Sequence, residues 1–270
     1  MYNKMYETER IRKMSGFTKT GALPLLISDN IKCSHGFSTR EGGVSHGNGF
    51  DTLDLGMGEK RDVTENRRRF ASALGADISR MFSAKQIHSG IVEAVTESDL
   101  GRHFECDGFV TNEKGLLLTV KVADCVPILM YDEVGVIAAV HAGWRGTVSG
   151  IAVNAVRKML ALGATAENIK VAVGPCIHSC CYEVDVPFVN AVKEAEYGSE
   201  LLQFIAPSDN RDKFYADLPS MNRHLLLSVG IKPENINVCK ECTSCHSDVF
   251  FSHRASHGKR GLMMGGIILK

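Results

Sequence analysis

Two short apolar runs separated by a polar break constrain the fold of this 270-residue chain more than any other feature. The runs span residues 126–130 and 136–140, and Glu133 is the middle of the break. Apolar runs of this length, rich in β-branched residues and split by a turn signal, predict two buried strands of a hairpin. A symmetric hairpin centred on Glu133 would place Cys125 directly opposite His141, with their Cβ atoms about 4.5–5.5 Å apart. A slip of one residue would point the two side chains to opposite faces, so this prediction depends on the register.

A thiolate and an imidazole at that separation offer two kinds of chemistry. They can bind one metal ion together, or they can hydrogen-bond as nucleophile and base. Each residue alone has a more ordinary interpretation, because a buried Cys often serves as a small core residue and a His beside a strand as a structural group. The pairing of Cys125 with His141, followed by the glycine-rich loop 142–146, favours a functional site.

His88 extends this pair to a set of three ligands. It lies in the segment 86–90, at the predicted end of a strand and before a glycine turn, where site residues are often placed. Three protein ligands with an open fourth position are typical of catalytic zinc, which lowers the pKa of its water to about 7 and polarises a substrate oxygen. Asp124 adjoins Cys125 in the sequence and could orient a ligand or move protons.

Composition and charge exclude several classes of protein. The 31 basic and 31 acidic residues give a net charge of zero, which argues against a phosphate-neutralising, nucleic-acid-binding face. No apolar run reaches the length of a membrane span, and the charged segment 1–13 lacks the apolar core of a secretory signal. We therefore expect a cytoplasmic protein whose nine cysteines stay reduced, with neither a nucleic-acid nor a membrane partner. The sequence indicates no particular oligomeric state.

A second group of metal-type residues lies near the C-terminus. Its members are Cys239, Cys242, Cys245 and His246. His253 or His257 could complete a tetrahedral zinc site there. An iron–sulfur cluster would need a fourth cysteine, and no further cysteine follows in the chain. An earlier group, Cys176, Cys180 and Cys181, has no paired spacing, and we expect ordinary reduced thiols there.

A series of short motifs resembles the YfiH/YlmD family, in the same order and over nearly the whole chain. The motifs are GFSTREGGVS (36–45), QIHSG (86–90), DGFVT (107–111), VADCVPI (122–128), AAVHAGWRG (138–146), VGPCI (173–177) followed by CYEV (181–184), and FFSHR (250–254). The two blocks ADC and HAGWRG are the most specific. Members of this family were first called laccase-domain or polyphenol oxidases, and they are now associated with purine nucleoside phosphorolysis and adenosine deamination.

The resemblance implies a fold and a set of site residues. The implied fold is α+β, a layered α/β/β/α sandwich with mixed sheets and an internal duplication, in a single domain over residues 21–270 after a lead-in of 1–20. The implied ligands of a single zinc ion are His88, Cys125 and His141. The substrate-binding residues that we expect are Arg40, Gln86, Asp124 and Arg145.

The activity implied by the resemblance is zinc-dependent phosphorolysis of purine nucleosides, such as adenosine, inosine and 5′-methylthioadenosine, to free base and ribose 1-phosphate. Adenosine deamination would accompany it. The residues leave three alternatives open: a metal-free cysteine hydrolase using Cys125 and His141, a copper-dependent polyphenol oxidase, and a non-catalytic metal-binding protein built on residues 239–257. Cu²⁺ is less expected than Zn²⁺, because type 1 copper needs a weak axial ligand and a laccase needs several copper ions with many more His ligands.

Overall fold

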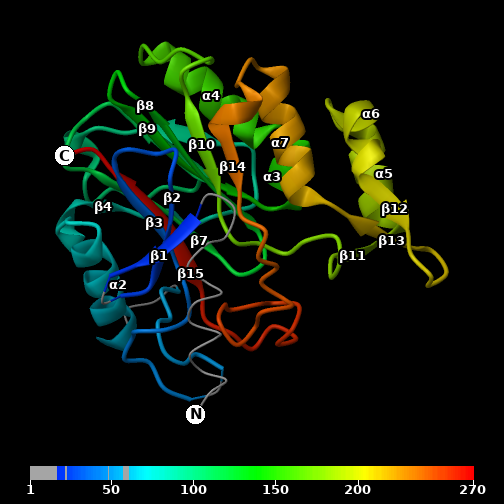
Figure 1. Ribbon diagram of the computed structural model, residues 1–270, viewed down its shortest axis with the longest axis horizontal. Coiled ribbons are helices and arrows are strands. Elements are labelled where there is room, and N and C mark those ends of the chain that lie inside the picture. Colours follow the sequence, from blue (N-terminus) through cyan, green and yellow to red (C-terminus); the bar gives the residue numbers. More distant parts are fainter. Residues whose placement is uncertain (1–16, 22, 48, 57–60) are drawn as a thin grey trace.

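Two six-stranded mixed sheets packed face to face form the centre of the protein (Figure 1). The computed structural model describes residues 17–21, 23–47, 49–56 and 61–270. The first sheet, in spatial order, contains β1 (Phe17–Thr20), β2 (Leu25–Ser28), β3 (Ser34–Ser38), β15 (Met263–Ile268), β7 (Leu117–Val122) and β4 (Met81–Phe82). The second contains β14 (Ile236–Val238), β10 (Lys170–Val173), β8 (Val126–Asp132), β9 (Val136–Ala142), β6 (Gly108–Thr111) and β5 (Val92–Ala94).

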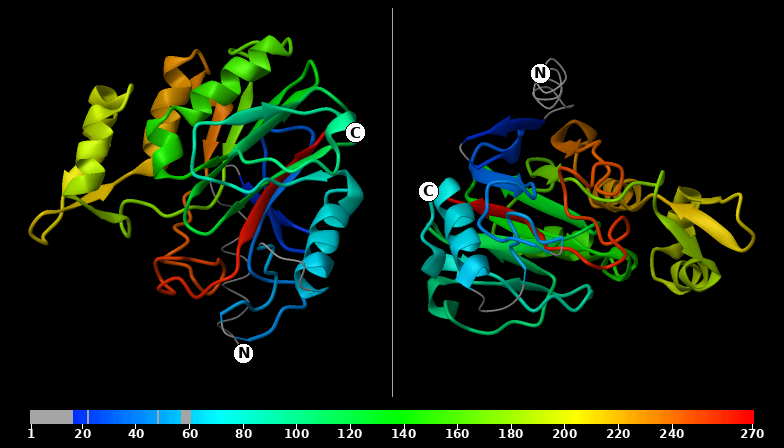
Figure 2. Two further views of the ribbon diagram at one scale, coloured as in Figure 1. Left: turned by 180° about the vertical axis from the view of Figure 1, so that it is seen from behind. Right: turned by 90° about the horizontal axis from the view of Figure 1, so that it is seen from below.

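Helices cover the outer faces of both sheets, and a small third sheet lies at one end (Figures 1 and 2). That sheet contains β11 (Glu183–Asp185), β13 (Lys213–Ala216) and β12 (Ile205–Pro207). The helices are α2 (Arg61–Ala73), α3 (Trp144–Val148), α4 (Ile151–Ala161), α5 (Val186–Glu194), α6 (Gly198–Leu201) and α7 (Leu218–Ser228), with 3₁₀ turns at Ile78–Arg80, Glu97–Asp99, Leu202–Phe204 and Pro233–Asn235. Within the described ranges, no helix is both long and apolar enough to span a membrane.

The buried side chains show the predicted α/β/β/α layering. Leu129 of β8 belongs to the core between the two sheets, whereas its neighbour Ile128 belongs to the core between the second sheet and α4. On the far side of the first sheet, Phe70 of α2 packs in a third core with Met264 of β15. Because both faces of the second sheet are covered, β8 and β9 are apolar at consecutive positions rather than at alternate ones. The layered sandwich with mixed sheets is therefore confirmed.

The N-terminal boundary differs from the expected one. Residues 1–16 of the predicted lead-in lie outside the described residues, but Phe17–Thr20 form β1, which pairs antiparallel with β2. Phe17 is buried and its ring lies 6.1 Å from that of Phe37, centroid to centroid. The last part of the lead-in is thus an edge strand of the domain, because its aromatic side chain contributes to the core between the sheets.

Candidate metal centre and adjoining pocket

The hairpin that carries Cys125 and His141 forms as predicted, but its register differs. Pro127, not Cys125, lies opposite His141, and the turn closes through Gly135 in a left-handed conformation. Relative to the predicted pairing, the two strands are shifted by two residues, so His141 lies diagonally across from Cys125. A shift of two keeps the side chains on the same face, whereas a shift of one would have separated them. The two residues therefore still meet, although not as a directly opposed pair.

His88 completes a group of three potential metal ligands with Cys125 and His141. The candidate ligand atoms of all three lie within 4.8 Å of one another. The imidazole rings of His88 and His141 meet edge to face, with centroids 4.9 Å apart. His88 reaches this place from the loop between β4 and β5, where its backbone has a φ of 58°. A non-glycine residue in this left-handed region is uncommon and is found most often at functional sites.

Asp107, which the sequence did not single out, organises the centre. Its carboxylate accepts hydrogen bonds from His141 Nδ1 (2.8 Å) and from the backbone N–H groups of Ile87 (3.2 Å), His88 (3.0 Å) and Ser89 (2.6 Å), and also from the Ser89 hydroxyl. The side chain is fully buried. Burial acts to raise the pKa of this carboxyl, but the hydrogen bonds from His141 and Ser89 outweigh it and hold the pKa at about 2. One carboxylate thus fixes both the His88 loop and the His141 ring.

Hydrogen bonds between Cys125 and His141 favour the charged form of each side chain. Burial acts to raise the pKa of the Cys125 thiol, but hydrogen bonds from His141 and His88 lower it to about 6. Burial acts to lower the pKa of His141, yet hydrogen bonds with Asp107 and Cys125 raise it to about 9. The thiolate is the form of Cys that binds metal ions and attacks electrophiles. Either a metal ion or an electrophilic substrate can use it.

Gly143 leaves the space that the three ligands need. A Cβ atom at this position would lie 2.9 Å from His88 Cδ2, 3.4 Å from Cys125 Sγ and 3.5 Å from His141 Cε1. Its backbone φ of −65° is available to any residue, so space and not backbone conformation requires glycine here. The two imidazoles and one thiolate around this space are a donor set suited to Zn²⁺.

Gly143→Ala is expected to weaken metal binding and turnover by about 10–100-fold, because the new methyl group would displace the His88 ring. Small displacements of a side chain at an active site can lower the rate by about this factor. Metal content after dialysis and steady-state kinetics measure the effect. Gly265→Ala is the matched control, since its Cβ would crowd Phe37 in the core at 3.1 Å. It should lower the unfolding temperature and leave metal affinity unchanged. Equal metal affinity in both variants would contradict the role given to Gly143.

Gln86 and Asp124 use their polar atoms within the protein. Gln86 pairs with the backbone of Lys121 in β7 at both ends of its amide, at 2.7 and 2.8 Å. Asp124 accepts hydrogen bonds from the Thr243 hydroxyl (2.6 Å) and the backbone N–H of Arg254 (2.7 Å). Both residues flank the centre and connect it to neighbouring segments. Their expected contact with substrate stays a prediction.

A pocket lined by aromatic, basic and acidic side chains adjoins the centre at the start of α3. Its lining residues are Trp144, Arg145, Tyr182, Glu183, Val184, Asp185, Pro187, Phe188, Lys213 and Arg254. Arg145 lies over the Trp144 ring at 4.2 Å, and Trp144 packs on Phe188 with ring centroids 5.2 Å apart. Trp144 directly follows Gly143 in the chain, so the pocket begins beside the candidate metal centre, and burial raises the pKa of the Tyr182 hydroxyl in its lining. Its volume of about 440 Å³ suits a small-molecule ligand.

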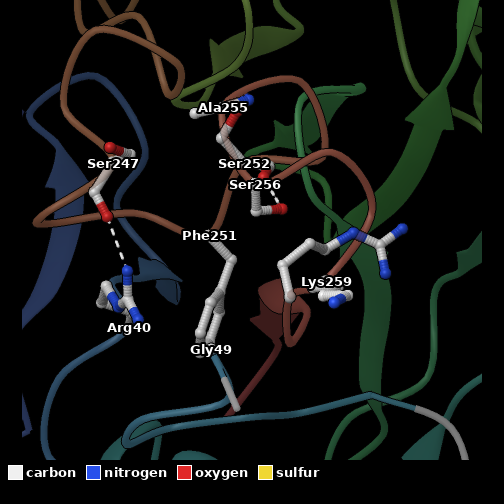
Figure 3. A pocket seen from close by; sticks show the side chains of 9 residues that line it. Arg40, Gly49, Ser247, Phe251, Ser252, Ala255, Ser256 and Lys259 are labelled. Carbon is white, nitrogen blue, oxygen red and sulfur yellow. Dashed lines mark hydrogen bonds between the residues drawn. The ribbon is translucent and has the colours of Figure 1, made fainter.

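Arg40 lies in a different pocket, shown in Figure 3 together with Phe251 and Lys259. The guanidinium donates to the backbone carbonyls of Asp51 (2.9 Å) and Ser247 (2.6 Å) and stacks over Phe251 at 4.8 Å. These contacts connect the N-terminal loop to the C-terminal segment. A role of Arg40 in binding substrate stays a prediction.

The C-terminal metal group is assembled differently from the expected one. Cys239 is buried in the core between the sheets, and neither His253 nor His257 belongs to a potential metal group in the part of the chain that the structure describes. Cys242 and Cys245 instead meet the two residues that we expected to be ordinary thiols, Cys180 and Cys181. The expected partners were wrong because spacing along one segment does not reveal what a neighbouring loop contributes.

Residues 34–270 match the family model described as multi-copper polyphenol oxidoreductase laccase. The chain belongs to this family. A protein named purine nucleoside phosphorylase YlmD, from Geobacillus stearothermophilus, is 36% identical to this chain over 249 residues, covering 86% of this chain and 88% of the relative. A protein named adenosine deaminase RL5, from an unknown prokaryotic organism, is 32% identical over 256 residues, covering 90% of this chain and 97% of the relative.

Solved structures of this laccase-like family have the same fold. The crystal structure of hypothetical protein YfiH from Bacillus licheniformis superposes with a TM-score of 0.87 at 31% identity, over 94% of this chain and 99% of the other. The resemblance to the YfiH/YlmD family is therefore confirmed. The named relatives are enzymes that act on purine nucleosides, and the family description refers to a copper oxidase.

Proposed function

We propose that this protein is a zinc-dependent purine nucleoside phosphorylase that also deaminates adenosine. The observation that carries the proposal is the convergence of His88, Cys125 and His141 beside a pocket lined with aromatic and cationic side chains. The names of the family's curated relatives support the same substrate class. Adenosine, inosine and 5′-methylthioadenosine are the substrates that we propose, in a cytoplasmic setting where the free thiols stay reduced.

The three ligand residues suit Zn²⁺ better than several copper ions. Two imidazoles and one thiolate would hold one ion, which when bound polarises a substrate oxygen and lowers the pKa of water. Because hydrogen bonds with Asp107 and Cys125 raise the pKa of His141 to about 9, a metal ion that bound to this ring would have to displace a proton from it. Asp107 then keeps Nδ1 of His141 protonated, so that Nε2 is the nitrogen available as a ligand.

The adjoining pocket provides contacts for both parts of a nucleoside and for phosphate. Trp144 and Tyr182 bring aromatic surface to the pocket, and aromatic side chains bind purine bases through contacts with their π-systems. Arg145, Arg254 and Lys213 bring positive charge to the pocket, and guanidinium groups match phosphate geometry. In phosphorolysis, a phosphate oxygen bonds to C1′ while the bond from C1′ to the base breaks. The base leaves with the electron pair and takes up a proton.

The Cys125–His141 pair supports a second candidate, a metal-free cysteine hydrolase. A thiolate with a pKa of about 6 beside a protonated imidazole is the arrangement of an activated cysteine nucleophile. The copper oxidase of the family description is less well supported, because only one group of the described residues combines His and Cys ligands, and laccase chemistry needs several coppers.

Metal removal separates these candidates. We expect dialysis against a strong chelator to abolish the conversion of adenosine, with and without phosphate, and added Zn²⁺ to restore it. Chromatography of base, ribose 1-phosphate and inosine measures each activity separately. A hydrolase using Cys125 would survive the chelator and be inactivated by iodoacetamide. Restoration by Cu²⁺ but not by Zn²⁺, with oxidation of a phenol, would favour the oxidase.

A further inference from the structure

Four cysteines from two distant loops meet on the surface of the protein. The Sγ atoms of Cys180, Cys181, Cys242 and Cys245 all lie within 4.8 Å of one another. Cys245 Sγ lies 3.3 Å from Cys181 Sγ and 3.6 Å from Cys180 Sγ. Cys242 is buried at the base of this cluster, whereas Cys180 and Cys245 are exposed. We call these four residues the cysteine tetrad.

The topology of the second sheet brings the two cysteine pairs together. Strands β10 and β14 are parallel neighbours, so the loops that follow them leave the same edge of the sheet. The loops remain in register, because Cys176 and Cys242 form a parallel bridge and Thr243 N–H donates to the Cys176 carbonyl at 2.9 Å. Residues about 65 positions apart in the sequence are thereby placed side by side, on a core that is buried beneath them.

The backbone around Cys242 is arranged to stabilise a thiolate. The N–H group of His178 donates to Cys242 Sγ at 3.5 Å, and the N–H groups of Ser244 and Cys245 also point to this sulfur. The N–H groups of Ser244 and Cys245 face the sulfur of Cys242, and this turn holds the sulfurs of Cys242 and Cys245 on one side of the loop. Two cysteines that bind one metal ion need this arrangement.

We propose that the cysteine tetrad is a second metal site, binding one Zn²⁺ through four thiolates. Four sulfurs around a tetrahedral zinc, each about 2.3 Å from the ion, lie about 3.8 Å from one another. The measured separations of 3.3 and 3.6 Å are close to this value. An iron–sulfur cluster places several atoms between its cysteines and would hold them farther apart. Four protein ligands leave no open position, so this site is structural rather than catalytic.

The proposed ion would fix one wall of the pocket. Cys181 precedes Tyr182, a lining residue, and its carbonyl accepts a hydrogen bond from Arg254 at 2.8 Å. Thr243, between the two cysteines of the other loop, donates to Asp124 beside Cys125. Through these contacts the tetrad connects both loops to the strand end that carries the first centre. The metal site itself does not depend on the proposed activity.

Metal counting in matched variants tests the proposal. Under reducing conditions we expect about two zinc ions per chain in the wild type, and one each in Cys125→Ala and in the double variant Cys242→Ser/Cys245→Ser. Cys33→Ser, which changes a thiol outside both groups, should keep two. Retention of two ions by the double variant, or none in Cys125→Ala, would overturn the proposal.

Cobalt substitution tests the tetrad without changing it. Cys125→Ala reconstituted with Co²⁺ should show the strong visible and charge-transfer absorption of a tetrahedral tetrathiolate site, and Cys180→Ser should weaken it. This measurement holds even if the double variant fails to fold. A Co²⁺ spectrum without thiolate bands would show that the tetrad binds no metal. The same conclusion would follow if mass spectrometry found a disulfide between tetrad cysteines after the protein had been treated with a reductant. Loss of nucleoside turnover alone would bear only on the first centre.

Discussion

Cys125→Ala is expected to lower both the phosphorolysis and the deamination of adenosine by at least about 10⁴-fold. Losses of this order follow the removal of one essential member of a catalytic unit. The variant loses the one thiolate of the first centre and leaves His88 and His141 as a two-residue site. Two imidazoles hold zinc much more weakly than two imidazoles and a thiolate. His141→Ala should have the same effect for the same reason.

Three measurements on Cys125→Ala decide its meaning. Turnover of adenosine, zinc at the first centre and the unfolding temperature should be recorded with Cys33→Ser as the matched thiol control. We expect Cys33→Ser to keep full activity, and Cys125→Ala to stay folded while losing activity and metal together. Full turnover by Cys125→Ala would refute the assignment of this centre. Lost turnover with the first-centre zinc retained would favour the cysteine nucleophile instead.

The hairpin shows how far local sequence patterns reach. Two apolar runs and a turn signal were enough to predict β8, β9 and the approach of Cys125 to His141. The register was not predictable, since the turn could be centred on Glu133 or on Val134, and only the left-handed Gly135 decides. The prediction that Cys125 and His141 meet still holds, because a shift of two residues leaves their side chains on the same face of the sheet.

Asp107 shows where residue-by-residue reasoning stops. The sequence favoured Asp124 as the carboxylate that orients a ligand, because it adjoins Cys125. In the folded protein Asp124 contacts Thr243 and Arg254, whereas Asp107 contacts His141. Pairing of β6 with β9 creates this contact, with Gly108 opposite Val140, and sheet order is not encoded in any short segment. An Asp just before the short apolar segment 109–110 was the available signal.

The cysteine tetrad required knowledge of sheet topology in the same way. The Cys-x-x-Cys spacing of Cys242 and Cys245 was visible in the sequence and suggested a metal site. Its second pair was visible too, at Cys180 and Cys181, but nothing local relates the two. Only the parallel pairing of β10 with β14 brings the two loops to the same end of the second sheet. Pairing between strands that are distant in the sequence is difficult to predict from one sequence.

Asp107→Asn is expected to lower the metal affinity of the first centre and kcat/KM by about 10–100-fold, the usual cost of losing the partner that orients a metal-binding histidine. The carboxylate has five donors facing its two oxygens. An amide offers one oxygen, so its NH₂ group must face either His141 and the His88 backbone, or Ile87 and Ser89. In both orientations the amide NH₂ group faces N–H or O–H donors instead of an acceptor. Buried donors without an acceptor lower the stability of the folded protein.

Ser89→Ala is the matched control for Asp107→Asn. It removes the hydroxyl bond to Asp107 Oδ2 and the bond that the same hydroxyl accepts from the Ile91 N–H, and it leaves the contact between Oδ1 and His141 in place. We expect near wild-type metal affinity from this variant, whereas Asp107→Asn should release zinc at chelator concentrations that the wild type withstands. Unfolding temperatures separate positioning from general damage, because a destabilised protein would lose stability in the metal-free form as well. If Asp107→Asn holds zinc as tightly as Ser89→Ala does, the carboxylate supports the loop alone and does not set the orientation of His141.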